Sequence, residues 1–376
     1  MQILLLSPYH GGSHRAWAEG YQANSAHKLS LLTLPAHFWK WRMHGGAVTL
    51  ARFWLDTLSE KLPDLILATD LLDLTTFLAL TRHKTADVPV ALYMHENQLT
   101  YPLPADPTIG PMRRQLGERD RHYAFINYIS MLAADKVFFN SRYHLDNFFG
   151  ALPAFLRHYP EYNELETVDL LRARSSVLPV GIDLQRLDPV MPAEDTTAPP
   201  LILWNQRLEY DKNPENFIAL LVELAAEGAA FRVALCGERF GKSSEKWEEG
   251  VAKLGERVIH NGFADPALYR QLLWESAITI STASHEYFGI SILEAMHCQT
   301  FPLLPARLSY PELIPASFHA DCLYHGRHDL FQRLQWATAN PSAARAIAAR
   351  LAPAAARFDW KVLAPRYDEE LGTMVG

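Results

Sequence analysis

The stretch "AITISTASHEYFGISILEAMHC", residues 277–298, contains a strand pattern and a helix pattern joined by a short turn. Residues 277–284 are apolar and β-branched, which predicts a buried strand, whereas the apolar spacing of residues 290–298 predicts a helix. Glu286 and Glu294 are eight positions apart, and a helix turns by about 100° per residue, so two glutamates of one helix would not share a face. We therefore expect Glu286 in the turn and Glu294 one turn into the helix.

Gly289 lies at the junction of this strand and helix, where the missing side chain lets a ligand approach the backbone. The first N–H groups of a helix have no partner within it and point at an anion that binds there. The turn therefore predicts a phosphate-binding site, at which we also place Phe288 and Ile290. The flanking carboxylates can accept hydrogen bonds from hydroxyl groups of a sugar or ribose. The stretch alone is equally consistent with a surface loop glutamate and a helix glutamate in a salt bridge.

Strand-like and helical patterns alternate along the whole chain. The strand-like runs are residues 2–9, 29–36, 64–69, 90–97, 135–141 and 175–183, and then 200–207, 231–238, 258–263, 277–284 and 300–306. This rhythm predicts an α/β protein with parallel sheets that helices cover on both faces. It breaks at residues 186–200, "RLDPVMPAEDTTAPP", where proline and short polar residues indicate a linker.

The rhythm and its break predict two Rossmann-like domains that face each other across a cleft. The N-terminal domain, expected to bind the acceptor, covers residues 1–185, and the C-terminal domain, expected to bind the donor nucleotide, covers residues 201–356. Residues 357–376 are expected to form a helix that packs back toward the N-terminal domain. Because ligands of such folds gather at the carboxyl ends of the strands, site residues should follow the strands directly.

Composition limits the class of protein. The chain has 376 residues, of which 49% are hydrophobic and 20% charged, which is typical of a globular protein with more than one core. No apolar run is long enough to span a membrane, so we expect no membrane partner. The cysteines, Cys236, Cys298 and Cys322, have no paired spacing, which favours a reducing cytoplasm. The net charge of −7 means that RNA binding would need a local basic patch.

Two further loops follow predicted strands. Gly11 and Gly12 form a second glycine turn, before a helix for which we expect Ser13 as the N-cap. Arg207 and Lys212 follow another strand within one short loop, where both cations could reach a diphosphate. The alternatives are a simple tight turn and two solvated surface cations.

Two histidine-containing segments could suggest metal sites. His10 and His14 lie beside the glycine turn, but no nearby carboxylate in the sequence completes a ligand set. In "HADCLYHGRH", residues 319–328, the strand predicted for "CLYH" would send Cys322 and His325 to opposite faces. We therefore expect no metal site.

The second half of the chain resembles the retaining family-four glycosyltransferases of the GT-B fold. The segments that carry the resemblance are "RLEYDKNP" (207–214), "CGE" (236–238), "HNGF" (260–263) and "HEYFGISILEAMHC" (285–298). The resemblance implies that Arg207 and Lys212 hold the donor diphosphate, that Glu294 contacts the ribose, that Glu286 orients the sugar and that His95 lines the reaction centre. One departure is Gln299, where many such enzymes have glycine.

The first half resembles a narrower family, the tRNA-queuosine mannosyltransferases. The matching segments are "YHGGSHRAWAEG" (9–20), "LTLPAHFWKWRMHGG" (32–46), "YMHENQLTYP" (93–102) and "FFNSRYHLDNF" (138–148). This resemblance implies GDP-mannose as the donor substrate, the queuosine base of a tRNA as the acceptor, and no other cofactor.

The acceptor RNA is expected to meet aromatic and basic side chains of the first half. Aromatic faces beside cations can stack a nucleobase and hold phosphates, as in "HFWKWRMH" (37–44), although spaced tryptophans are more often buried packing. The arginines of the basic segment "MRRQLGERDRHY" (112–123) could meet an anticodon stem, and the alternative is a solvated helix face with Glu118 and Asp120 as their partners. The expected acceptor residues are His10, His14, Trp39, Trp41, Arg42, Glu96, Asn97, Gln98, Arg113 and Arg114.

The sequence thus predicts a cytoplasmic, metal-independent retaining mannosyltransferase that uses a front-face mechanism, with Arg207 and Lys212 on the leaving diphosphate. No glutamate pair at glycosidase separation is evident, which disfavours a double-displacement hydrolase. Two alternatives stay open. One is a related transferase with another nucleotide sugar and a small-molecule or lipid acceptor; the other is a non-catalytic protein that binds a nucleotide sugar or RNA.

Overall fold

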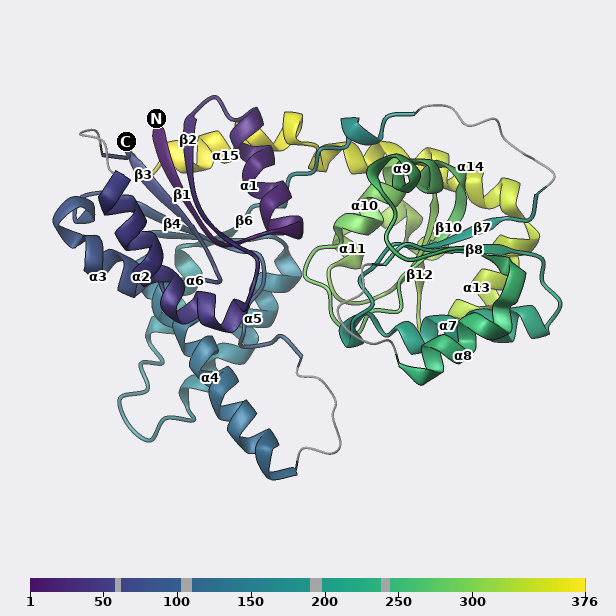
Figure 1. Cartoon of the computed structure of the whole chain (residues 1–376), viewed down its shortest axis with the longest axis horizontal. Coiled ribbons are helices and arrows are strands. Elements are labelled where there is room, and N and C mark those ends of the chain that lie inside the picture. Colours follow the sequence, from purple (N-terminus) through teal and green to yellow (C-terminus); the bar gives the residue numbers. More distant parts are fainter. Residues whose placement is uncertain (58–61, 103–109, 190–197, 238–243, 376) are drawn as a thin grey trace. The chain divides into compact units, whose positions relative to one another are not determined.

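The computed structural model describes residues 1–57, 62–102, 110–189, 198–237 and 244–375, with the side chains of residues 110–120 left out of the description. The chain forms two compact units (Figure 1). Unit 1 consists of Met1–Ile182 and Phe358–Gly376, and unit 2 of Asp183–Arg357. The predicted linker begins with the 3-10 helix Gln185–Leu187, which belongs to unit 2, while residues 190–197 lie outside the described residues.

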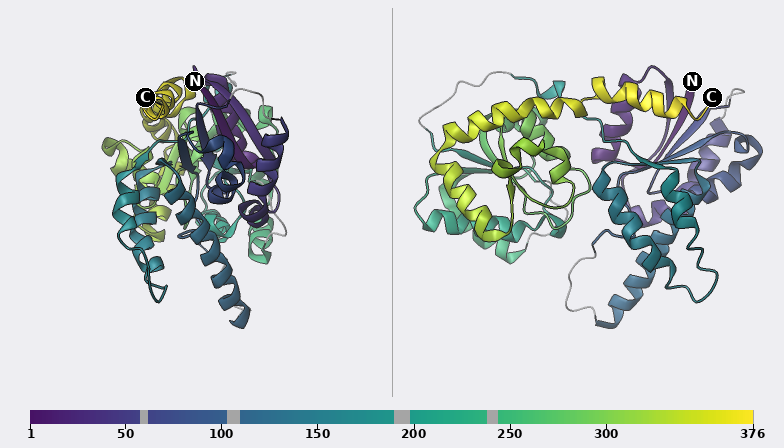
Figure 2. Two further views of the ribbon diagram at one scale, coloured as in Figure 1. Left: turned by 90° about the vertical axis from the view of Figure 1, so that its left-hand side faces the viewer. Right: turned by 180° about the vertical axis from the view of Figure 1, so that it is seen from behind.

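Unit 1 is built on a six-stranded parallel sheet of order β2-β1-β3-β4-β5-β6. Its strands are β1 Gln2–His10, β2 Lys28–Pro35, β3 Leu65–Thr69, β4 Val90–Met94, β5 Lys136–Phe139 and β6 Ser175–Val177. Its helices are α1 Gly12–Asn24, α2 Trp39–Thr57, α3 Leu74–Thr85, α4 Gly110–Ala133, α5 Arg142–Leu156, α6 Thr167–Ala173 and α15 Trp360–Gly372. Helices α1 and α15 lie on one face of the sheet, and α2 and α3 on the other (Figures 1 and 2).

The C-terminal helix α15 completes unit 1. Trp17 of α1 donates a hydrogen bond to the hydroxyl of Tyr367 at 3.0 Å. The ring of Trp360 packs directly on Gly20 and Gly181, where a Cβ would lie 2.1 and 2.4 Å from ring atoms. These glycines are therefore needed for the close approach of α15 to α1 and to the segment after β6.

Unit 2 repeats the arrangement with a six-stranded parallel sheet of order β12-β11-β10-β7-β8-β9. Its strands are β7 Leu201–Trp204, β8 Arg232–Leu235, β9 Val258–Asn261, β10 Ser276–Ile280, β11 Phe301–Pro305 and β12 Leu323–Tyr324. Its helices are α7 Pro214–Ala226, α8 Glu245–Leu254, α9 Pro266–Glu275, α10 Ile290–His297, α11 Tyr310–Leu313, α12 His319–Cys322, α13 Arg327–Ala339 and α14 Pro341–Leu351.

The α/β prediction is confirmed, and the strands lie in the predicted runs. They could be located because strands covered on both faces are continuously apolar, and the residues of β3, β4, β7, β10 and β11 are all buried. Among the described helices, none combines the length and hydropathy needed to cross a membrane.

Two local predictions were wrong. Gly11, not Ser13, is the N-cap of α1, because the helix begins at Gly12 with φ +50°, which leaves Ser13 inside the first turn. Cys322 ends the short helix α12 instead of starting a strand, and it is buried there. The three cysteines are all free, and no three His, Cys, Asp or Glu side chains of the described residues gather as metal ligands would.

Candidate functional site

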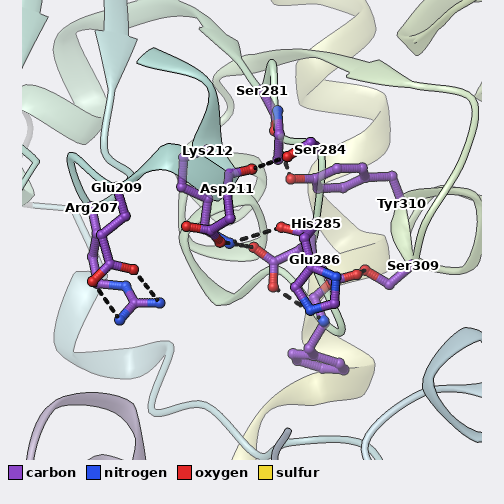
Figure 3. Close-up of polar contacts among 12 residues, drawn as sticks. Arg207, Glu209, Asp211, Lys212, Ser281, Ser284, His285, Glu286, Ser309 and Tyr310 are labelled. Carbon is purple, nitrogen blue, oxygen red and sulfur yellow. Dashed lines mark hydrogen bonds and ion pairs between the residues drawn. The ribbon is translucent and has the colours of Figure 1, made fainter. Parts of the chain in front are cut away.

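The centre of the candidate site in unit 2 is the ammonium group of Lys212. A 3-10 helix, Tyr210–Lys212, follows β7 and carries this side chain into a buried position. Its Nζ lies 2.9 Å from Oδ2 of Asp211 and 3.1 Å from Oε2 of Glu286, and donates to the carbonyl oxygen of His285 at 3.0 Å (Figure 3). An ammonium has three N–H donors, so the protein itself uses all of them in this state.

This cluster holds both Lys212 and Glu286 in their charged forms. Burial alone would lower the pKa of Lys212, but Glu286 and Asp211 outweigh burial and raise it. Burial alone would raise the pKa of Glu286, but Lys212 and the amide of Phe288 bring it below its usual value. Glu286 is therefore an acceptor of hydrogen bonds and not a proton donor at neutral pH.

The turn after β10 has the geometry that the sequence predicts. Glu286 lies in the turn and Glu294 within α10, as expected. Gly289 is the N-cap of α10 with φ +112°, a conformation that side chains rarely adopt. The amide of Phe288 donates to Oε1 of Glu286 at 3.2 Å, and the first amides of α10, starting at Ile290, follow directly. An anion at this turn would meet a helix N-terminus beside the Lys212 ammonium.

Glu294 lies in a second polar cluster on α10. Its carboxylate is buried, Oε2 accepts from the hydroxyl of Tyr269 at 2.7 Å, and Oε1 pairs with the guanidinium of Arg186. Burial, with the Glu294 charge beside it, raises the pKa of Tyr269 well above its usual value. Asn205, next after β7, donates to the Tyr269 hydroxyl at 3.1 Å and to the carbonyl of Ser291 at 2.9 Å.

Arg207 occupies a different environment from Lys212. Its side chain is 47% exposed, and its guanidinium lies 3.2 Å from the carboxylate of Glu209. Figure 3 shows the two cations in the same loop region, with Lys212 inside the Asp211–Glu286 cluster and Arg207 apart from it. The sequence predicts that both cations bind the diphosphate, and the structure pairs Lys212 with Glu286 and Arg207 with Glu209.

In unit 1 the centre of the candidate site is the His95 ring. His95 follows β4 directly, and its imidazole packs against the rings of His14, Trp17 and Tyr93, at centroid distances of 4.4, 4.7 and 4.7 Å. Burial, and then the neighbours His14 and His144, lower the pKa of His95 well below its usual value. The imidazole is therefore neutral at physiological pH.

Buried polar side chains from the neighbouring strand ends hold the backbone of His95. Oδ1 of Asp70, directly after β3, accepts from the His95 amide at 2.9 Å. Asn140, directly after β5, donates to the His95 carbonyl at 2.8 Å. Both peptide groups of His95 are thus fixed from the strands on either side.

The residues after His95 form a tight polar turn. The side chain of Asn97 is fully buried and accepts from the amides of Leu99 and Thr100, at 3.0 and 2.9 Å. Glu96 accepts from the side chain of Gln98 at 3.0 Å. Asn97 therefore stabilises the turn, while Glu96 and Gln98 are partly exposed beside it.

The glycine turn after β1 is packed on one side and open on the other. A Cβ on Gly11 would lie 2.4 Å from the Cβ of Ala36, whereas nothing would lie within 4 Å of a Cβ on Gly12. The sequence showed no carboxylate beside His10, but α1 places Glu19 there, with 3.4 Å between His10 Nε2 and the carboxylate.

The expected acceptor residues on α2 divide into two kinds. Trp39 packs against Tyr123 at a ring distance of 5.3 Å and lies beside a small buried cluster, whereas Trp41 is exposed. Nε of Arg42 donates to the carbonyl of Pro35 at 3.1 Å. Arg113 and Arg114 lie in α4, but their side chains are outside the described residues.

Sequence reasoning missed five polar residues that support these sites: Asp70, Asn140, Arg186, Asp211 and Tyr269. Arg186 meets Glu294 across 108 positions of the chain, and its local pattern indicated only a linker. Asp70 and Asn140 could have been found, because each is the first polar residue after a buried strand.

Comparison with known proteins identifies the family. Residues 2–182 match the family model "tRNA-queuosine alpha-mannosyltransferase N-terminal", and residues 193–347 match "Glycosyl transferases group 1". The chain is 30% identical over 325 residues to a tRNA-queuosine alpha-mannosyltransferase of Drosophila melanogaster, covering 83% of this chain and 81% of the relative.

Solved structures confirm the GT-B fold. Sucrose-phosphate synthase from Thermosynechococcus elongatus superposes with a TM-score of 0.70 at 16% identity, covering 99% of each chain. The catalytic domain of starch synthase IV from Arabidopsis thaliana, bound to ADP and acarbose, also gives 0.70 at 11% identity, covering 100% of this chain and 99% of that one. With the relative above, these likenesses lead to one conclusion: this chain is a glycosyltransferase of the GT-B fold and belongs to the tRNA-queuosine alpha-mannosyltransferase family.

Proposed function

We propose that this enzyme transfers mannose from GDP-mannose to the queuosine base of a tRNA, with retention of the anomeric configuration, in the cytoplasm. Family membership and the activity named for the fly relative support the reaction. The observation that carries the mechanism is the meeting of the Lys212 ammonium, the Glu286 carboxylate and the start of α10 in one turn. The three unpaired cysteines agree with a reducing compartment.

The leaving diphosphate would be stabilised mainly by Lys212 and the amides at the start of α10. Of the three partners of Lys212, the His285 carbonyl is the uncharged one, so exchanging it for a phosphate oxygen loses the least attraction. Arg207, at the surface, would add a second cation by leaving Glu209. By comparison with oxyanion sites, a donor of this kind contributes about 3 to 4 kcal/mol to the transition state. These cations neutralise the diphosphate without a metal ion in our proposal.

Glu286 and Glu294 would bind the two sugars of the donor. Glu286 stays ionised next to Lys212 and would accept hydrogen bonds from mannose hydroxyls. Glu294 has one partner on each oxygen, and a carboxylate offers about four lone-pair positions, so ribose hydroxyls can still bind.

The acceptor hydroxyl would attack from the side of the leaving group. In this front-face reaction the bond from the anomeric carbon to the diphosphate breaks as the bond to the acceptor oxygen forms. The acceptor proton passes to the departing diphosphate oxygen. Neutral His95 would line the reaction centre without exchanging a proton.

Direct assay of the product tests this proposal. The protein is incubated with GDP-mannose and with tRNA that either contains or lacks queuosine, and the tRNA is digested to nucleosides for mass spectrometry. We expect one hexose on queuosine and none on the unmodified tRNA. UDP-glucose serves as the control donor. Absence of hexose from queuosine-containing tRNA would remove the proposed acceptor.

A further inference from the structure

Two large aromatic side chains are exposed at the start of α2. Phe38, which directly precedes the helix, is 81% exposed, and Trp41 in its first turn is 62% exposed. They are three positions apart, and the carbonyl of Phe38 accepts the amide of Trp41 at 2.8 Å. Large aromatic groups are normally buried on most of their surface, so this pair requires an explanation.

The local backbone and a glycine hold both rings in these positions. Phe38 has φ +51°, a left-handed conformation that disfavours residues other than glycine. The indole of Trp41 lies against Gly45, where a Cβ would be 2.5 Å from Cζ2 and 2.6 Å from Cε2. A glycine in a helix interior lowers helix stability, and here it makes room for an exposed ring.

The sequence around the two rings is basic, although the whole chain is acidic. Residues 35–55 contain Lys40, Arg42 and Arg52 but no aspartate or glutamate, in a chain with net charge −7. The ammonium of Lys40 lies over the ring of Trp39, 5.2 Å from its centroid. The segment therefore combines stacking surfaces with charges that complement phosphate groups.

The pair lies at the carboxyl ends of the strands of unit 1, where the candidate site residues also lie. Strand β2 ends at Pro35, which pairs with His10 at the end of β1, and Ala36 touches Gly11. Phe38 and Trp41 thus follow β2 at the end of the sheet where the glycine turn follows β1. His95 follows β4 at the same end, two strands beyond β1.

We propose that Phe38 and Trp41 form a stacking platform for unpaired bases of the acceptor RNA next to the base that receives the sugar. This inference rests on the proposed function, since it takes a tRNA as the acceptor. Bases of single-stranded loops can turn outward and stack on aromatic side chains, whereas paired bases in a stem cannot. The platform therefore selects a loop over a stem by stacking, and the nearby cations contact its phosphates.

Binding of queuosine-containing tRNA to the full-length protein tests the platform. We expect Phe38→Ala and Trp41→Ala each to raise Kd by about 5- to 150-fold, the factor that corresponds to the loss of one stacked base. Trp41→Phe should retain most of the affinity. Because a ring carries no charge, the slope of log Kd against log salt concentration should stay the same.

Two further variants separate a binding role from a structural one. Gly45→Ala should displace the Trp41 ring and weaken RNA binding, while thermal stability stays equal or rises, because alanine favours the helix. Tyr162→Ala is the matched control, since Tyr162 is 86% exposed with φ +47° in the same unit but next to Glu161 and Glu164. It should leave Kd unchanged.

The outcomes distinguish the platform from the proposed reaction. Unchanged Kd in the Phe38 and Trp41 variants, while the wild type still modifies tRNA, would overturn the platform alone. Weakened binding in those variants without any hexose transfer by the wild type would overturn the reaction alone. Equal competition by a fully paired RNA duplex, or equal loss in Tyr162→Ala, would also contradict stacking.

Discussion

Lys212 is the residue at which stability and catalysis are most tightly linked. Replacing it with methionine leaves the buried Asp211 and the mostly buried Glu286 without a counter-charge. Breaking a buried ion pair from one side costs about 3 to 5 kcal/mol, so we expect Lys212→Met to lower the free energy of unfolding by that order. We also expect a loss of turnover of about a hundredfold or more. Urea denaturation and single-turnover assays measure the two effects.

A double variant separates the two effects. Adding Asp211→Asn to Lys212→Met removes one unpaired charge, so part of the lost stability should return, whereas turnover should not. Recovery of turnover together with stability would show that Lys212 serves the fold and does not bind the leaving group.

Gln299 is strained by the way in which α10 ends. The amide of Thr300 bonds to the carbonyl of Ala295 at 2.9 Å, and that of Gln299 to Met296 at 3.0 Å, which is the pattern of a Schellman motif. Gln299 therefore occupies the position that glycine favours, with φ +59°. The departure from the family pattern at this residue thus affects the backbone at the helix end.

We expect Gln299→Gly to stabilise the protein by up to about 1 kcal/mol, because the left-handed conformation costs residues other than glycine about 1 to 2 kcal/mol. Calorimetry should show a higher Tm. Gln299→Ala keeps the strain and serves as the control, so an equal rise in Tm for both variants would contradict this explanation.

At the scale of elements, the turn after β4 depends on side chains from β3 and β5. Asp70 is buried, and burial together with the nearby Glu96 raises its pKa well above the usual value. A protonated carboxyl resembles an amide, so Asp70→Asn should keep the bond to the His95 amide and most of the activity. Asp70→Ala leaves that buried amide without its partner, which costs about 1 to 3 kcal/mol. It should also lower kcat more than it changes KM for GDP-mannose.

Steady-state kinetics of the two Asp70 variants, with urea denaturation in parallel, check this prediction. Asn140→Ala should behave like Asp70→Ala, since Asn140 holds the carbonyl of the same residue, His95. If Asp70→Asn were as damaging as Asp70→Ala, the turn would need a charge and not only an acceptor.

Elements were more predictable from the sequence than contacts between them. The buried strands are continuous apolar runs, and the turn with Glu286 and Gly289 follows from local pattern alone. The pairing of Glu294 with Arg186, by contrast, joins residues 108 positions apart. The start of α1 was misjudged because Gly11, and not the expected Ser13, is the N-cap, and the helix begins at Gly12 with φ +50°. Local patterns thus predict elements, while buried polar pairs depend on which elements meet.

At the scale of the whole molecule, each unit holds a neutral histidine at its candidate site, His285 buried in unit 2 and His95 partly buried in unit 1. Burial, and then the charge of Lys212, lower the pKa of His285 to about 4, with Glu286 and Asp211 opposing the shift. Burial, and then the neighbours His14 and His144, lower the pKa of His95 in unit 1. The two units therefore respond to acid in the same direction, although they have separate cores.

The direction follows from proton binding by the unfolded chain. An unfolded histidine titrates near pH 6.5, so between about pH 6.5 and pH 4 the unfolded state binds a proton at residue 285 that the folded state does not. The stability that depends on neutral His285 is complete above this range and falls as the pH drops through it. From pH 7.5 to pH 5 we expect a loss of about 2 kcal/mol from this residue, and a further loss in unit 1 from His95. Urea denaturation at the two pH values measures the difference. His285→Gln should unfold with a smaller difference between them, because glutamine does not titrate, and equal differences in the variant and the wild type would contradict a neutral His285.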